Sequence, residues 1–109
     1  MASEQAKRQL TRMQELGLTE SLAYRPKVGA SRTIVAVVDR QLPAEVMHAL
    51  APGMVVTALN DATLGIVPAS LDVGADSIDL AERFGGTAAA RGIQAVTNQD
   101  SDWISFTVR

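Results

Sequence analysis

Residues 91–109, RGIQAVTNQDSDWISFTVR, decide the fold, because they predict a β-hairpin at the end of the chain. Apolar and polar side chains alternate in the final run, with Ile104, Phe106 and Val108 on the apolar face. A period of two is typical of a strand with one buried face. Residues 98–102 supply Asn, Asp and Ser for the turn. A chain that ends inside its own core sheet is expected to be complete.

The composition predicts one folded domain. The chain has 109 residues, of which 47% are apolar and 20% charged, so it is long enough to bury a core and too apolar to be disordered. It has no cysteine, which excludes disulfides, thiolate metal sites and cysteine nucleophiles.

The net charge of −2 argues against a partner that binds through phosphate neutralisation, so we expect no nucleic acid. No segment has the ~18 apolar residues of a membrane span. The N-terminus lacks the apolar core of a signal peptide. We therefore expect a cytoplasmic protein without a membrane partner.

Residues 3–16 predict the one convincing helix, with Ser3 as its N-cap and Gly17 as its C-terminal stop. Its apolar side chains form a narrow stripe: Ala6, Leu10, Met13 and either Leu16 or Leu18. Such a helix is marginal alone, so it must dock on the sheet or on a neighbouring subunit. We expect residues 1–20 to form a helical arm that is mobile in the isolated subunit.

From residue 21 to residue 109 the pattern predicts a compact β domain. A first strand contains Leu22, Tyr24 and Val28 and is interrupted by Pro26, and residues 33–39, TIVAVVD, form the best central strand.

Residues 54–60 and 63–68 predict a hairpin around Asn60–Asp61. Residues 77–84 fit a short strand better than a short helix, and residues 44–50 fit either. The fold class is therefore mainly β (α+β), with an N-terminal helix followed by a small antiparallel β-sandwich or barrel of about six short strands.

The sequence carries no reaction signature, so we predict no catalytic residue, no metal ligand and no cofactor. His48 is the only histidine, and it has no recognisable orienting partner. The loop aspartates around Gly74 lack the ligand spacing of a calcium loop. Those that flank Ser101 suit a turn, and residues 84–92, FGGTAAARG, match no phosphate-binding motif.

Three stretches of the chain resemble the small head-to-tail joining proteins of tailed bacteriophages and prophages. They are YRPKVGASRTIVAVVDRQLP (24–43), TLGIVPASLDVGADSIDLAERFGG (63–86) and the terminal hairpin at 91–109. The resemblance is one of layout and length, without a diagnostic motif. It implies an N-terminal helical segment, a compact β-sandwich or barrel, and a structural protein that forms a ring between the head (portal or adaptor) and the tail.

Ring symmetry requires two different contact patches on each subunit. Our candidates are the helix stripe, with Leu10 and Met13, and the face of Trp103. Trp103 lies opposite the apolar face of the last strand, so it either packs against the N-terminal helix or anchors an interface. The resemblance implies other copies of the chain and other phage head and tail proteins as partners, in the cytoplasm of a bacterial host or in the virion.

Two alternatives remain open. One is a β-rich module that binds proteins or other ligands. The other follows from residues 77–92, SIDLAERFGGTAAARG, which are similar to the substrate-binding part of phosphoesterases of the DHH family. That second alternative implies a helix over 77–92. In this chain Thr87 to Ala89 replace the expected glycine and histidine.

Overall fold

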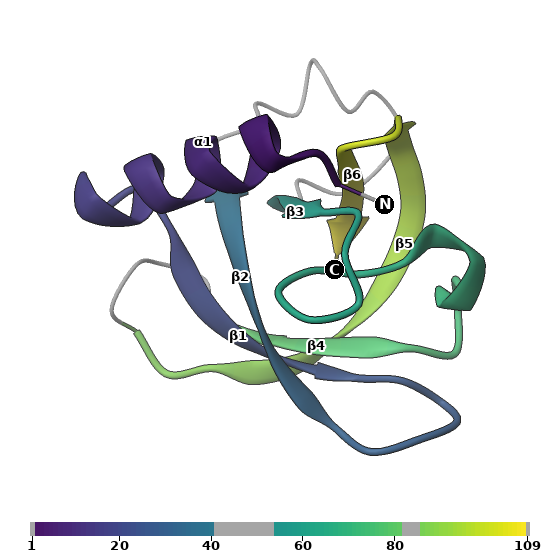
Figure 1. The fold of residues 1–109 in the computed structure, drawn as a ribbon. Coiled ribbons are helices and arrows are strands. Elements are labelled where there is room, and N and C mark those ends of the chain that lie inside the picture. The colour runs from purple at the N-terminus through teal and green to yellow at the C-terminus, as the bar shows by residue number, and fades with distance from the viewer. Residues whose placement is uncertain (1, 41–53, 82–85, 109) are drawn as a thin grey trace.

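A computed structural model describes residues 2–40, 54–81 and 86–108 of the chain. Six strands form a closed antiparallel barrel, and one helix lies against its outer face (Figure 1). The elements are α1 (Glu4–Glu15), β1 (Glu20–Arg25), β2 (Arg32–Asp39), β3 (Met54–Leu59), the short 3-10 helix η1 (Pro68–Ser70), β4 (Ser77–Leu80), β5 (Ala89–Gln99) and β6 (Trp103–Val108). The expected fold class is confirmed, and between the two expected architectures the barrel is the observed one.

The strands follow the order β1-β2-β3-β6-β5-β4 around the barrel, and β4 returns to β1. Strand β2 lies between β1 and β3, which confirms residues 33–39 as a strand with two neighbours. The terminal hairpin is also confirmed, because β5 pairs with β6. At its tip Asp100 Oδ1 accepts hydrogen bonds from the backbone N–H groups of Asp102 and Trp103, at 2.7 Å each.

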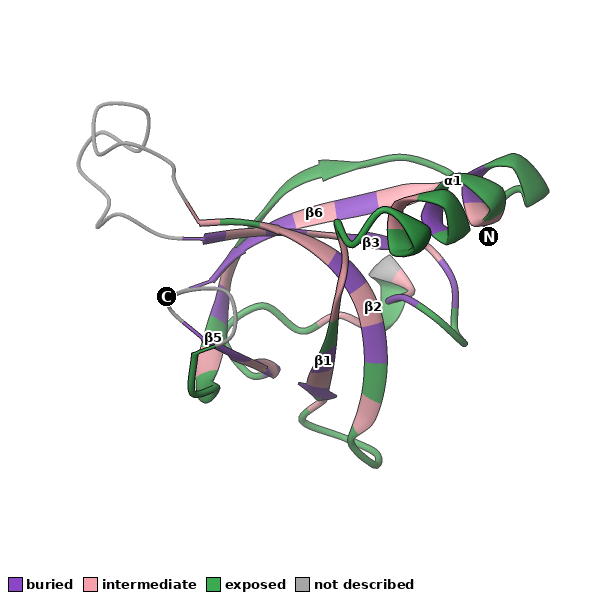
Figure 2. Ribbon diagram, turned by 90° about the vertical axis from the view of Figure 1, so that its left-hand side faces the viewer, coloured by how far each residue is buried: buried purple, intermediate pink, exposed green. Residues whose placement is uncertain are grey.

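Alternation of side chains builds the core inside the barrel. In β6 the predicted apolar face is buried completely, and in β2 Ile34 and Ala36 are buried while their neighbours are not (Figure 2). Side chains of all six strands meet in one cluster, to which Ile66 is added from a loop. Tyr24 and Ile78 belong to this cluster, so residues 77–80 form a strand as expected.

The hairpin predicted for residues 54–60 and 63–68 is wrong in its second half. Strand β3 forms, but both of its edges are occupied by β2 and β6, so a strand at 63–68 would find no edge to pair with. The chain turns back instead, and the Ile66 N–H donates to the Leu59 carbonyl at 2.9 Å. This loop carries Ile66 into the core and leads into η1.

Gly65 makes that turn possible. A Cβ atom at this position would lie 1.8 Å from the Leu59 carbonyl oxygen, so only glycine fits between the loop and the end of β3. The apolar run of residues 63–68 therefore follows from burial of the loop and not from strand pairing.

Two further details of the expected elements need correction. Val28 lies in the turn between β1 and β2 and is 85% exposed, because β1 ends at Arg25, before Pro26. Leu16 and Leu18 are also exposed and do not extend the buried helix stripe, since the helix ends at Glu15 and Gly17 turns the chain with a φ of 72°. Ser3 is the N-cap, as expected, and accepts a hydrogen bond from the Ala6 N–H.

Candidate functional site

The helix α1 packs on the outside of the barrel through a small apolar group, called here the helix cluster. Its buried members are Ala2, Ala6, Leu10 and Leu59, with Met13, Val35 and Trp103 partly buried around them. Leu10 is 1% exposed, so it offers no surface to a partner while the helix is docked. Met13 and Trp103 retain some exposed surface, and Trp103 takes the helix-packing position that the sequence left open.

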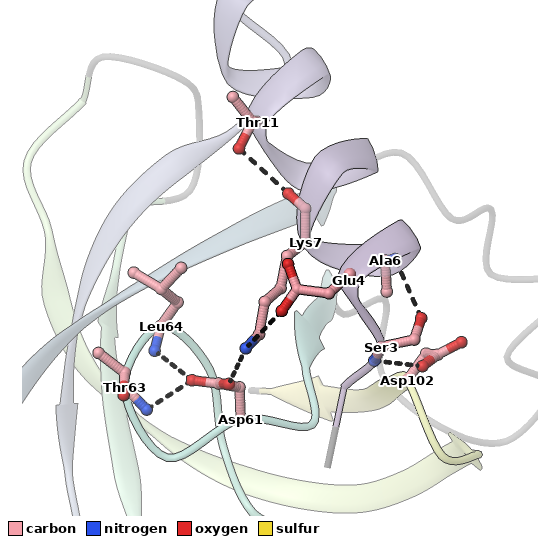
Figure 3. A network of polar contacts seen from close by, with 9 residues as sticks. All are labelled: Ser3, Glu4, Ala6, Lys7, Thr11, Asp61, Thr63, Leu64 and Asp102. Carbon is pink, nitrogen blue, oxygen red and sulfur yellow. Dashed lines mark hydrogen bonds and ion pairs between the residues drawn. The ribbon is translucent and has the colours of Figure 1, made fainter.

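Polar contacts fix the start of the helix to the barrel. The Ser3 N–H donates to Asp102 Oδ1 at 2.8 Å (Figure 3). The Ala2 N–H donates to the Asn60 carbonyl at 2.8 Å. Lys7 Nζ lies 3.6 Å from Asp61 Oδ2. The predicted mobility of the 1–20 arm in solution stays a prediction, but the contacts that would hold it are now defined.

Asp61 is a buried carboxylate that shapes the loop after β3. It accepts hydrogen bonds from the backbone N–H groups of Thr63 and Leu64, at 2.7 and 3.0 Å. The bond from Leu64 and then that from Thr63 lower the pKa of Asp61, against the opposing effect of burial, and Lys7 lowers it further. The ionised carboxylate therefore supports the loop and the docked helix together.

Asp76 holds two loops at the same end of the barrel. Its carboxylate is 2% exposed and accepts hydrogen bonds from the Tyr24 hydroxyl at 2.5 Å, the Lys27 N–H at 2.8 Å and the Asp72 N–H at 2.9 Å. Burial raises the pKa of Asp76, but these hydrogen bonds outweigh it and the net pKa is lowered. Burial, followed by the bond to Asp76, raises the pKa of Tyr24.

Asp72 and Asp76 lie in the loop before β4, as predicted, whereas Asp79 lies within β4. Asp79 does not join this network. It pairs with Arg25 on the outer surface, with 2.9 Å between Arg25 Nη2 and Asp79 Oδ2. No group of three or more acidic, histidine or cysteine side chains within the described ranges is arranged to hold a metal ion.

Arg40 links three elements beside the barrel wall. Its guanidinium binds both carboxylate oxygens of Glu20 at the start of β1, with Nη2 2.7 Å from Oε1. Its Nε donates to the Ala81 carbonyl, just after β4, at 3.0 Å. The hydrogen bond to Glu20 raises the pKa of Arg40, and desolvation by burial partly opposes this rise.

A surface groove of about 590 Å³ runs beside this contact, between β1 and the β4–β5 side of the barrel. Among the described residues that line it, several have small side chains: Ser21, Ala23, Gly86 and Ala88. Next to the groove, β1 and β4 pair at Tyr24–Ile78 and Arg25–Ser77. We call it the β1–β4 groove.

Sequence reasoning missed this groove, together with the roles of Arg40 and Asp76. The Asp39–Arg40 step before Pro43 is visible in the sequence, but nothing in its pattern shows which strands Arg40 joins. Partial pairing of two strands that are fifty residues apart likewise leaves no local signal.

Other sequence candidates have simple placements. His48, residues 44–50 and most of the Phe84–Gly86 stretch lie outside the described residues. Ser21 lies on the outer face of β1 and Ser101 in the exposed hairpin turn. In the part of the chain that the structure covers, no helix is long and apolar enough to cross a membrane.

Residues 77–80 and 89–92 are strands and not the single helix that the phosphoesterase alternative implies. That alternative therefore loses the structural feature on which it depended.

Comparisons of the chain with protein-family models, with curated proteins and with solved structures found no match.

Proposed function

We propose that the chain is a structural protein that assembles with copies of itself into a ring and joins larger parts of a virus particle, as head-to-tail joining proteins of tailed bacteriophages do. The observation that carries the proposal is the architecture, in which an N-terminal helix precedes a closed antiparallel barrel of six strands. This is the layout that the resemblance of the sequence implies. The protein would then act in the bacterial cytoplasm and remain in the virion.

The charged side chains of the described residues mainly hold strands and loops in place, which supports a structural role. Glu20 is bound by Arg40, Asp79 by Arg25, and Asp61, Asp76 and Asp100 each accept hydrogen bonds from backbone N–H groups. Buried or bonded carboxylates of this kind fix loops and strand ends in place. A rigid barrel with fixed loops suits a protein that must present the same surfaces in every copy of an assembly.

The mass of the purified protein in solution, measured by light scattering over a series of concentrations, tests the proposal. We expect one defined multimer, or a monomer that converts to that multimer as the concentration rises. A monomer at every concentration contradicts assembly by the chain alone.

A monomeric interaction module is the second candidate, and the β1–β4 groove is the observation that favours it. A surface groove with small side chains along its wall can accept an extended peptide from another protein. This candidate would be supported over the ring by a monomeric mass at every concentration, together with binding of the purified protein to a partner that is not a phage head or tail protein.

A further inference from the structure

Helix α1 and the barrel have separate apolar cores. The cluster that fills the barrel, as far as the chain is described, contains no residue of α1. The helix cluster lies on the outside of the barrel, and among its buried members only Leu59 comes from a strand. The interior of the barrel would therefore stay filled if α1 moved away from its present position.

The segment that joins α1 to β1 is called here the hinge, and it consists of residues 16–19. The backbone N–H groups of Leu16, Gly17 and Leu18 donate to carbonyls in the last turns of α1, at 2.9–3.1 Å. None of these three bonds reaches the barrel. They close the end of the helix and do not fix the hinge to a strand.

The hinge also carries exposed apolar surface. Leu16 is 60% exposed and Leu18 is 57% exposed. After Leu10, Met13 is the only residue of α1 that is partly buried. This end of α1 extends past β2 to the left edge of the molecule in Figure 1. The two leucines therefore lie where a neighbouring copy can cover them, and their burial would be favourable.

The barrel surface under α1 is complementary to this helix in its polar groups as well as in its apolar ones. Asp102 Oδ1 accepts a hydrogen bond from the Ser3 N–H at 2.8 Å, and Asp61 Oδ2 lies 3.6 Å from Lys7 Nζ (Figure 3). Every copy of the chain carries both this surface and this helix. The occupant that fits the surface is therefore α1, either of the same chain or of a second copy.

We infer that, in the assembled protein, α1 of each copy docks on the barrel of the next copy, with the hinge opened into an extended link. The inference rests on the proposed function and names the contact between copies. Exchange of an identical element re-forms the contacts of the helix cluster. It also allows the neighbouring copy to cover the two hinge leucines.

Exchange of α1 gives the kind of contact that a ring requires. Each copy gives one helix and receives one, so the contact is head-to-tail and uses two different surfaces of each subunit. Four extended residues span about 13 Å, so the hinge can join barrels that lie directly side by side. The candidate residues Leu10, Met13 and Trp103 would then lie in the contact between copies.

Two cysteines in one chain distinguish a helix on its own barrel from a helix on the next barrel. The natural chain has no cysteine, and the Ala2 N–H donates to the Asn60 carbonyl at 2.8 Å. Ala2→Cys and Asn60→Cys therefore place two thiols on opposite sides of the helix contact. Protein with both substitutions is oxidised mildly at the highest concentration used for light scattering and separated by non-reducing electrophoresis.

We expect a ladder of covalently linked copies up to the size of the ring, because each disulfide then joins two chains. Ala2→Cys combined with Val28→Cys is the matched control for chance collisions, since Val28 is 85% exposed in the turn between β1 and β2. The inference is overturned if the chain with Ala2→Cys and Asn60→Cys forms only internal disulfides. It is overturned also if this chain yields no more linked copies than the control.

The length of the hinge gives a second readout that needs no cysteine. A long flexible hinge favours a helix that returns to its own barrel over exchange between copies. Insertion of Gly-Ser-Gly-Ser between Gly17 and Leu18 should therefore raise the dissociation constant of the assembly about tenfold or more. The same insertion after Val28 should leave it unchanged. Equal effects of both insertions, with unaltered circular dichroism, contradict the inference.

These results separate the two proposals. A ring-sized mass with only internal disulfides leaves the proposed function standing and overturns the exchange of α1. Linked copies that never exceed two chains retain the exchange and overturn the ring, since two copies then exchange helices reciprocally. A monomer with an internal disulfide at every concentration contradicts both.

Discussion

At the scale of single residues, the structure depends on a few positions where one atom decides the local path of the chain. Gly65 is the clearest, because its backbone lies directly against the Leu59 carbonyl. Asp76 is the second, since three donors from different segments meet at one carboxylate. Both residues fix the path of a loop, and the sequence pattern predicted neither role.

Gly65→Ala should destabilise the protein by about 3 kcal/mol or more, because a new Cβ would lie 1.8 Å from backbone and the loop carrying Ile66 would have to move. Gly92→Ala is the control, since a Cβ there meets nothing within 4 Å. Urea denaturation of both variants measures the difference. Equal free energies of unfolding would refute the close approach at Gly65.

Asp76→Asn should lower the free energy of unfolding at neutral pH by about 1–3 kcal/mol, because the amide cannot accept from all three donors. The pKa of Asp76 is lowered in the folded state, so its stabilising effect is complete above the unfolded carboxyl pKa of about 3.9 and is lost as the pH falls through the lower, folded value.

The difference between the natural protein and Asp76→Asn should therefore shrink below about pH 4. Denaturation measured from pH 7 down to pH 2 checks this dependence, with Tyr24→Phe as the variant that removes one donor and keeps the carboxylate. A difference that stays constant over this range would show that the charge of Asp76 contributes nothing.

At the scale of elements, the sequence predicts two kinds of helix or strand. They are those that pair with a segment nearby in the sequence and those that bury only one face. The 33–39 strand, the terminal hairpin and the Ser3 cap are of this kind. The predicted 63–68 strand failed because both edges of β3 are taken, by β2 and by β6, and β6 is distant in sequence. The β1–β4 groove and its Arg40 contact were not predicted for the same reason, since they depend on long-range pairing.

The candidate interface residues show the same limit. The stripe of α1 was correctly identified at Ala6 and Leu10, which are buried. Whether that stripe faces the chain's own barrel or another subunit could not be decided from the pattern, because both would bury the same side chains. In the structure the stripe packs against Leu59 of the same chain, so it faces the chain's own barrel.

Leu10→Ala should release or loosen α1, at a cost of about 2–5 kcal/mol in the free energy of unfolding if the helix and barrel unfold together. Leu16→Ala is the control, because Leu16 is the C-cap of α1 and is 60% exposed. Hydrogen exchange of residues 3–16 provides the measurement, with faster exchange expected only for Leu10→Ala. Fast exchange of this segment already in the natural protein would support the mobile arm predicted from the sequence.

At the scale of the whole molecule, six strands close around one core and the helix α1 packs on the outside of the barrel. Side chains from all six strands fill the interior, and the outer ion pairs hold the strands near the groove. A subunit that passes α1 to the next copy can repeat one contact around a closed circle while its barrel stays unchanged.

Electron microscopy of the concentrated, unmodified protein tests whether it assembles into rings. We expect closed rings with a single number of subunits and a central opening in class averages. Particles the size of one subunit, or two-fold dimers without larger species, would contradict it.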